Sequence, residues 1–234
     1  MVLLELLRGL ELEIRPEAVP LLERLAEELL RWNRSRNLTA ITERDAVLEK
    51  HLVDSLTLLP FALQARRLLD IGSGAGFPAL PLKIVCPELA VVSVDAVGKK
   101  IDFQRHIVRL LKLQNFAALH GRIEPLQEQA NYRAGFDLVT ARALCGLADL
   151  LALAEPFLAS GGRLVAMKGP EGHQEFAALR DRRGAIQHKR KLFISGESNR
   201  QRVGSQHIFH PKGGSDRRAG IRSGHADHAG FNRH

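Results

Sequence analysis

Three glycines stand close together just after a short apolar segment. Gly72, Gly74 and Gly76 alternate with small residues and follow the segment 68–71. Glycine has no Cβ atom, so it allows the sharp bends and the close approach of a ligand that such a turn requires. A glycine-rich turn at the carboxyl end of a first parallel strand is a common site for an adenosine-containing cofactor. Asp95 ends a second apolar segment about 23 residues further on, where its carboxylate can accept hydrogen bonds from both ribose hydroxyls.

The spacing of this turn separates two kinds of adenosine ligand. A dinucleotide-binding turn usually reads Gly-x-Gly-x-x-Gly and presents a helix N-terminus to a pyrophosphate, whereas here Phe77 follows directly after the third glycine. Asp70 lies two residues before the first glycine, where a carboxylate would repel a pyrophosphate but suits a cationic ligand. The turn therefore favours S-adenosylmethionine, a sulfonium without phosphate, over the dinucleotide of an oxidoreductase.

Structural roles remain open for the same residues. Asp95 could instead cap the helix that follows it, and Asp70 could serve only the turn or a cap. Phe77 could pack on the cofactor or fill the space between the turn and the next helix. A tight turn without any ligand is disfavoured, because three glycines cost conformational entropy.

Length and cysteine content limit the class of protein. The chain has 234 residues, enough for one domain with an extension or for two small domains. Its two cysteines, Cys86 and Cys145, are too few for a disulfide framework, so we expect a reducing, cytoplasmic environment. The N-terminus has no basic segment of the kind that begins a signal peptide. The most apolar stretch, 147–159, contains Asp149 and Glu155, which argues against a membrane span.

The net charge of +8 is unevenly distributed along the chain. Residues 180–234 contain 13 Lys and Arg but 4 Asp and Glu residues, whereas residues 1–179 contain 21 and 22. A basic body typical of nucleic-acid binding is therefore absent, and any RNA-binding surface outside the tail must be a local patch.

The periodicity of apolar residues predicts alternating helices and strands. We expect helices at 16–33, 45–59, 79–85, 98–112 and 147–158, and strands at 66–71, 90–94, 115–119, 136–140 and 162–167. Pro60 is expected to end the second of these helices. Such alternation predicts an α/β fold with a doubly wound parallel sheet and right-handed crossovers, preceded by a helical cap.

Three parts follow from this pattern: an N-terminal helical cap at 1–60, a cofactor-binding domain at 61–183 and a basic tail at 184–234. The tail is rich in Arg, His, Gly and Ser. Its few apolar residues cannot bury enough surface to offset the entropy of ordering, so we expect it to be largely disordered.

Seven short motifs occur in an order typical of one known family. They are Trp32-Asn33, Asn37-Leu38-Thr39, His51-x-x-Asp54-Ser55, the turn 70–78, Gly98-Lys99-Lys100, Arg142-Ala143 and Lys168-Gly169. Over roughly residues 15–180 the chain resembles the bacterial small-subunit ribosomal RNA guanine-N7 methyltransferases, the glucose-inhibited division protein B family. The resemblance implies a class I S-adenosylmethionine-dependent methyltransferase fold with a Rossmann-like sheet. It implies transfer to a guanine of 16S ribosomal RNA near the decoding region, with this RNA or the small ribosomal subunit as partner. We expect a monomer.

Further site residues are carried over from the family by motif. Gly72, Phe77, the pair Ile123 and Glu124 after the third strand, and Arg142 at the end of the fourth would contact the donor. Together with Gly74, Gly76 and Asp95 these residues form the predicted donor site. Arg142 could instead contact the guanine or a phosphate or form a structural ion pair, and Glu124 could be a solvated loop residue.

The chain departs from the family pattern at two places. Ala141 stands where the family usually has Ser. After about Arg183 the two antiparallel strands that normally end the family's sheet have no counterpart, which would leave a sheet edge unpaired. A protein that binds donor or RNA without turnover is therefore the alternative function.

The implied chemistry requires orientation of the reactants more than it requires acid–base groups. Guanine N7 has a lone pair and no proton to lose, so we expect no general base and nominate no catalytic residue. Both cysteines are expected to be buried core thiols rather than nucleophiles. No spacing typical of a metal site occurs, and no metal is expected.

Several polar groups could instead position the substrate. His51 and Asp54 could form a surface pair on a helix, anchor the adjoining loop or position the substrate. Two basic clusters could be solvated faces or could follow the phosphates of RNA. These clusters are Lys99, Lys100, Arg105, Arg109 and Lys112, and, around Trp32, Arg31, Arg34 and Arg36.

Overall fold

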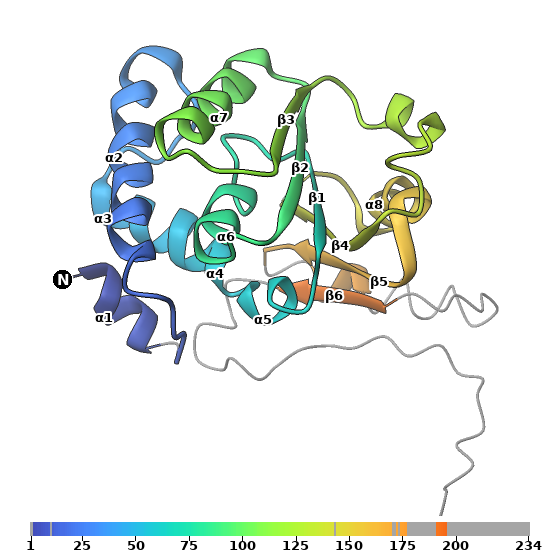
Figure 1. Ribbon diagram of the computed structural model, residues 1–234, viewed down its shortest axis with the longest axis horizontal. Helices are drawn as coiled ribbons and strands as arrows, with labels where there is room; N and C mark the ends of the chain where they lie inside the picture. Colours follow the sequence, from blue (N-terminus) through green and yellow to red (C-terminus); the bar gives the residue numbers. More distant parts are fainter. Residues whose placement is uncertain are drawn as a thin grey trace, which may run out of the picture.

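The computed structural model describes residues 2–9, 11–142, 144–169, 172 and 174–176, and the backbone of 191–195. A parallel sheet runs through the described part of the chain in the order β3-β2-β1-β4-β5-β6 (Figure 1). Its strands are β1 (Arg67–Ile71), β2 (Ala90–Asp95), β3 (Phe116–His120), β4 (Phe136–Arg142), β5 (Leu158–Met167) and β6 (Lys191–Ser195). The order changes direction between β1 and β4, which creates a crevice at the carboxyl ends of the strands.

Helices cover both faces of this sheet. Figure 1 shows α6 (Ala79–Val85), α7 (Gly98–Leu110) and the N-terminal helices on one side and α8 (Leu147–Ala154) on the other. Successive residues of a strand point to opposite faces. Leu68 accordingly belongs to the core under the N-terminal helices and Leu69 to the core under α8. The predicted doubly wound α/β fold is confirmed.

The N-terminal helices differ in detail from the prediction. The chain begins with α1 (Val2–Gly9), which was not predicted, and continues with α2 (Ala18–Arg36). The predicted helix 45–59 is divided into α3 (Arg44–Val47), the π-helical segment η1 (Leu48–Val53) and α4 (Asp54–Leu56). Pro60 does not end this helix but lies in the first turn of α5 (Leu59–Ala62), where a missing amide hydrogen costs nothing.

The edge of the sheet beyond β5 is paired. Strand β6 lies within the tail that was expected to be disordered, and it runs parallel to β5 with Phe193 opposite Val165. The apolar triplet 192–194, which looked too isolated to fold, is therefore part of a strand. The prediction that the edge of β5 is left unpaired is therefore wrong, and β6 is the last strand of the sheet among the described residues. The remainder of the predicted disordered tail lies outside the described residues.

Short 3₁₀ turns, η2 (Glu124–Glu128) and η3 (Glu155–Phe157), complete the described elements. Among these elements no helix combines the length and apolar character that crossing a membrane requires.

Candidate functional site

A pocket of about 400 Å³ lies at the carboxyl ends of β1, β2 and β4. The glycine turn, the ends of these strands, the start of α7 and two segments of the N-terminal cap form its walls. The lining residues are Leu38, Thr39, His51, Gly72, Ser73, Gly74, Ala75, Phe77, Asp95, Ala96, Val97, Lys100, Arg142 and Leu144. Of the predicted donor-site residues, the structure thus brings together Gly72, Gly74, Phe77, Asp95 and Arg142.

The glycine turn adopts backbone conformations that other residues rarely reach. The φ angles are +65° at Gly72, +59° at Gly74 and +93° at Gly76. Gly76 does not line the pocket. A Cβ atom at Gly76 would lie 2.6 Å from Cδ1 of Leu80 and 3.1 Å from Cγ of Gln104, whereas a Cβ at Gly74 would meet nothing within 4 Å. Gly76 is therefore needed for packing, and the open space at Gly74 leaves room for a ligand.

We expect Gly76→Ala to destabilise the fold much more than Gly74→Ala. Both changes force an alanine to a positive φ, at about 1–2 kcal/mol each. The Gly76 variant must also displace packed side chains, which adds about 1–3 kcal/mol. Urea unfolding of both variants measures the difference in their free energies of unfolding. Equal losses of stability would contradict the packing argument.

The glycine turn is held by Gln104 of α7, which is not among the residues predicted for the site. Gln104 is fully buried on α7, and its Nε2 donates to Oγ of Ser73 at 2.9 Å and to the carbonyl of Gly74 at 2.8 Å. Its Oε1 accepts a hydrogen bond from Ser93 of β2 at 2.6 Å. A polar residue on the apolar face of the helix 98–112 was the signal that could have revealed it.

Asp95 connects the glycine turn to the start of α7. Its Oδ2 accepts a hydrogen bond from the amide of Gly74 and its Oδ1 from the amide of Val97, each at 2.8 Å. The N-terminus of α7 has no side-chain cap, because Val97 precedes the helix, so the helix-capping prediction for Asp95 is wrong. Asp95 does line the pocket. Each carboxylate oxygen has a second lone pair, which can accept a hydrogen bond from a ribose hydroxyl.

Asp70 is completely buried beneath the turn and does not itself line the pocket. Its Oδ1 accepts a hydrogen bond from the hydroxyl of Thr140 at 2.9 Å, while Oδ2 accepts none from the described residues. Burial raises the pKa of Asp70 to about 7, although the Thr140 hydrogen bond, the Arg142 charge and the Ala79 amide act to lower it. A buried carboxylate with a free lone pair suits a cationic ligand nearby.

Thr39 of the N-terminal cap lines the pocket, and the side chain of Asn33 fixes the backbone at Thr39. The Asn33 side chain accepts hydrogen bonds from the amides of Leu38 and Thr39 at 2.6 Å and 2.9 Å. It also donates to the carbonyl of Thr39 at 2.9 Å. The motifs at 32–33 and 37–39 are thus joined by the hydrogen bonds of the Asn33 side chain.

His51 is buried between the cap and the sheet, so its predicted role as a helix-surface residue is wrong and its role as a loop anchor is correct. Its ring stacks on Phe77, with the centroids 4.8 Å apart. Nε2 lies 2.9 Å from the hydroxyl of Thr39, and Nδ1 lies 3.2 Å from Nη1 of Arg142. Burial, together with the Arg142 charge, lowers the pKa of His51 to about 4, so the ring is neutral at neutral pH. Nη1 of Arg142 also lies 3.9 Å from Asp54.

The remaining predicted site residues, Ile123 and Glu124, do not line this pocket. Ile123 is buried in the core under α8, and Glu124 begins the exposed turn η2, where it lies 3.9 Å from Arg122. Their contact with the adenine stays a prediction. Burial raises the pKa of both cysteine thiols, which makes them poor nucleophiles. Cys86 is buried as expected, but Cys145 is partly exposed.

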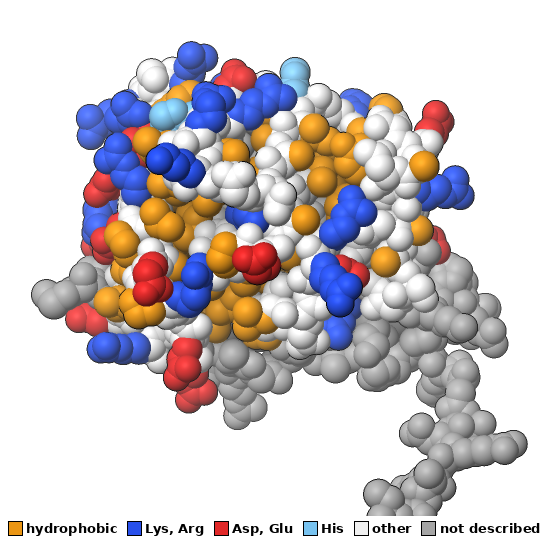
Figure 2. All heavy atoms as spheres, in the orientation of Figure 1, with side chains coloured by type: hydrophobic (Ala, Val, Ile, Leu, Met, Phe, Trp, Pro, Cys, Tyr) orange, Lys and Arg blue, Asp and Glu red, His pale blue; other side chains and the backbone are white. Residues whose placement is uncertain are grey.

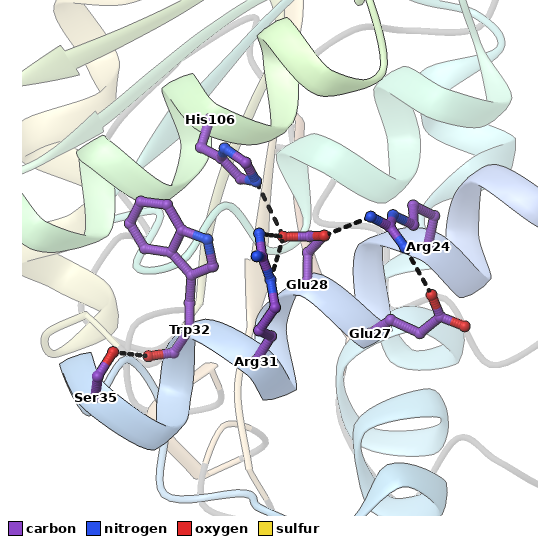
Figure 3. A network of polar contacts seen from close by, with 7 residues as sticks. All are labelled: Arg24, Glu27, Glu28, Arg31, Trp32, Ser35 and His106. Carbon is purple, nitrogen blue, oxygen red and sulfur yellow. Dashed lines mark hydrogen bonds and ion pairs between the residues drawn. The ribbon is translucent and has the colours of Figure 1, made fainter.

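The basic residues of α2 and α7 gather on one part of the surface (Figure 2). Two arginines of α2 are already paired within the protein: Arg24 and Arg31 both contact the buried carboxylate of Glu28, which also contacts His106 (Figure 3). Burial opposes ionisation of Glu28, but hydrogen bonds from Arg31 and His106 outweigh it and lower its pKa. Arg31 thus belongs to a structural cluster between α2 and α7, and Lys100 reaches the pocket itself.

The pocket fits an adenosine ligand with a cationic amino-acid end. Asp95 offers acceptors for a ribose, the surface at Gly74 is open, and Asp70 keeps an unused acceptor beneath the turn. Arg142 supplies the positive counterpart. Among the described residues no group of three or more His, Cys, Asp or Glu side chains could hold a metal ion. A parallel doubly wound sheet with such a pocket at its switch point defines a class I methyltransferase.

Comparison with known proteins identifies the family. The model described as rRNA small subunit methyltransferase G, GidB, matches residues 18–204. The ribosomal RNA small subunit methyltransferase G of Syntrophotalea carbinolica is 49% identical over 191 residues, 82% of each chain. The protein with the same description from Geobacter sp. strain M21 is 49% identical over 178 residues, 75% of this chain and 81% of that protein. A solved methyltransferase structure from Geobacter sulfurreducens covers 61% of this chain and 69% of that chain, with a TM-score of 0.47 and 17% identity.

The chain belongs to the rRNA small subunit methyltransferase G (GidB) family, whose methyl donor is S-adenosylmethionine. The matched region continues to residue 204, past residue 183, where the motif resemblance ended. The first part of the tail is therefore matched by the family as well.

Proposed function

We propose that this protein transfers a methyl group to N7 of a guanine in 16S ribosomal RNA near the decoding region. One observation carries the proposal: in a chain of this family, the cap and the sheet enclose a pocket lined by Asp95, the open Gly74 and the cationic Arg142, and the carboxyl group of Asp70 is buried beneath the glycine turn. When bound there, the donor supplies a methyl group on a cationic sulfur.

The protein's own residues bind and orient the reactants in this proposal. Asp95 holds the ribose, while Asp70 and Arg142 face the charged amino-acid end. Ile123 and Glu124 lie near the adenine. Because guanine N7 has no proton to lose, no side chain needs to act as a base. The reaction rate then depends on orientation, which can supply several orders of magnitude.

The substrate reaches the pocket across the basic surface in the same proposal. Arg34 and Arg36 in the last turn of α2 and the Lys and Arg residues of α7 would contact RNA phosphates, and RNA binding would then weaken as the salt concentration increases. We further propose that the protein acts as a monomer in the cytoplasm, with residues 1–60 as cap, 61–183 as methyltransferase domain and 184–234 as basic tail.

The test is methyl transfer with a labelled donor to naked 16S RNA and to intact small subunits, both from cells that lack this modification. Nucleoside analysis should find 7-methylguanosine, and the Asp95→Ala variant should form at least about 100-fold less product at limiting donor. Label in another nucleoside would contradict the proposed target atom. Donor binding without transfer to either substrate would support the alternative of a non-catalytic RNA-binding protein.

A further inference from the structure

We propose that His51 is a positioning residue that directs the Thr39 hydroxyl and the Arg142 guanidinium toward the carboxylate of the methyl donor. The proposal rests on the proposed placement of the donor in this pocket. It assigns part of the donor site to the cap: Thr39 would contact the ligand, and His51 would act through its two neighbours. All three residues line the pocket.

The hydrogen-bond partners of His51 determine which of its two ring nitrogens carries the proton. Arginine donates hydrogen bonds and accepts none, so the contact of Nη1 with Nδ1 at 3.2 Å requires Nδ1 to be the acceptor. In a neutral imidazole the proton must then lie on Nε2, which donates to the Thr39 hydroxyl at 2.9 Å. The Lys50 carbonyl competes for a proton on Nδ1, but it already accepts a hydrogen bond from the same Nη1 at 3.3 Å.

This pattern determines where the Thr39 hydroxyl hydrogen can point. The oxygen of Thr39 accepts from His51 and also from the amide of Ile41 at 3.2 Å, which occupies both of its lone pairs. Its own hydrogen must be donated to a further group, and no described residue accepts it. Because Thr39 lines the pocket, a ligand atom is the natural acceptor.

Arg142 has donors left for the same ligand. Every hydrogen bond that it makes to a described residue leaves from Nη1, toward His51 and Lys50. The Nε and Nη2 groups therefore keep three N–H donors. The Phe77 ring lies 5.8 Å from the guanidinium carbon, and together with the bonds at Nη1 it restricts the plane of the group.

A carboxylate is the acceptor that fits two converging donors, one of them cationic. The donor's amino-acid end has both signs of charge, and so does this part of the protein: Arg142 lines the pocket, and the carboxyl group of Asp70 is buried beneath the glycine turn. The ammonium would face Asp70 and the carboxylate would face Arg142 and Thr39.

The experiment compares two ligands by calorimetry. S-adenosylhomocysteine carries the amino-acid end, whereas 5′-methylthioadenosine shares the nucleoside but lacks the carboxylate. We expect His51→Phe, which keeps an aromatic ring on Phe77, and Thr39→Val each to weaken S-adenosylhomocysteine binding by about 10- to 100-fold. Both variants should bind 5′-methylthioadenosine within about twofold of wild type. Thr39→Ser should restore affinity for the first ligand, because it restores the hydroxyl.

A matched control is present in the same protein. His106 also packs against an aromatic ring, with its centroid 5.0 Å from that of Trp32 and the two ring planes tilted by 35°. It contacts a polar partner, Glu28, at 3.0 Å, but it lies outside the pocket. His106→Phe should leave both affinities unchanged. Thermal unfolding of each variant reports whether it is folded. If His51→Phe does not fold, Thr39→Val still tests the proposal.

Equal losses for both ligands would overturn the proposal, since they would indicate general damage to the pocket. An unchanged affinity for S-adenosylhomocysteine with a raised KM for RNA would also overturn it, because the donors would then face the guanine. These binding measurements need no RNA. A protein that behaves as expected here but forms no 7-methylguanosine would refute the proposed function alone.

Discussion

Asp70→Asn is expected to weaken donor binding at pH 8 by about 10- to 100-fold while raising the stability of the ligand-free protein. At pH 8 the buried carboxylate is mostly charged, since its pKa is about 7. The charge favours a cationic ligand but is costly in the empty protein. Asparagine removes both effects, and Thr140 can retain a hydrogen bond because its hydroxyl both donates and accepts.

The stability difference has a defined pH window. The pKa of Asp70 is raised by folding, from 3.8 to about 7, so between these values the folded state binds more protons than the unfolded state. Stability of the wild type therefore falls as pH rises from about 4 to about 7, by up to about 4 kcal/mol from this group. The advantage of Asp70→Asn should be largest above pH 7 and disappear near pH 4. Urea unfolding at several pH values measures it.

Donor binding should show the opposite dependence on pH. Below pH 7 Asp70 takes up a proton, so the wild type should lose affinity while Asp70→Asn does not. Protonation of the ligand affects both proteins equally. The difference between their profiles of donor affinity against pH therefore gives the contribution of Asp70 alone. Asp137→Asn is a suitable control, because Asp137 accepts hydrogen bonds from the amides of Arg66 and Arg67 before β1, at the opposite end of the strands. Parallel profiles for Asp70→Asn and wild type would exclude an electrostatic role for Asp70.

Asp95→Ala should cause the second large loss, with donor affinity reduced at least about 100-fold and stability by about 2–5 kcal/mol. The variant leaves the amides of Gly74 and Val97 without their acceptor, and it removes the acceptors for the ribose. Asp95→Asn, which keeps one acceptor oxygen, should lie between the variant and the wild type. Calorimetry and denaturant unfolding give the two quantities.

A loosened turn could by itself reduce affinity, and Gln104→Ala tests this contribution. Gln104 holds the same turn through Ser73 and Gly74 but does not line the pocket. If Asp95 contacts the ribose, Asp95→Ala should lose far more affinity than Gln104→Ala at a comparable loss of stability. Similar losses in both variants would assign Asp95 a structural role only.

The central part of the fold could be predicted from the sequence because its signals are local. Strand β1, the glycine turn and Asp95 at the end of β2 lie within about 30 residues, and periodicity and turn chemistry specify each of them. The segments that were predicted wrongly depend on distant contacts. The strand at 191–195 forms by pairing with β5, and η1 departs from a regular helix where His51 packs against Phe77.

The site was predicted in part for the same reason. Glycines and the acid after the second strand follow a spacing rule, whereas the role of His51 depends on partners 12 and 91 residues away. The signal for Gln104 was a polar residue on the apolar face of a helix, and this pattern does not show which groups such a residue contacts; its bonds to Ser73 and Gly74 could be identified only from the structure. The charge of Arg31 suggested RNA, but the buried Glu28 that pairs with it could be identified only from the structure.

Residues of both the cap and the sheet line the pocket. Thr39 and His51 belong to the cap, whereas the glycine turn and Asp95 belong to the sheet. A ligand that touches both also holds them together, so its binding free energy adds to the cohesion of the two parts. At a donor concentration 100 times its Kd this addition is about 2.7 kcal/mol. Fluctuations that open the cap should accordingly become about 100-fold rarer in the presence of donor, and amide hydrogens of residues 33–56 should exchange correspondingly more slowly.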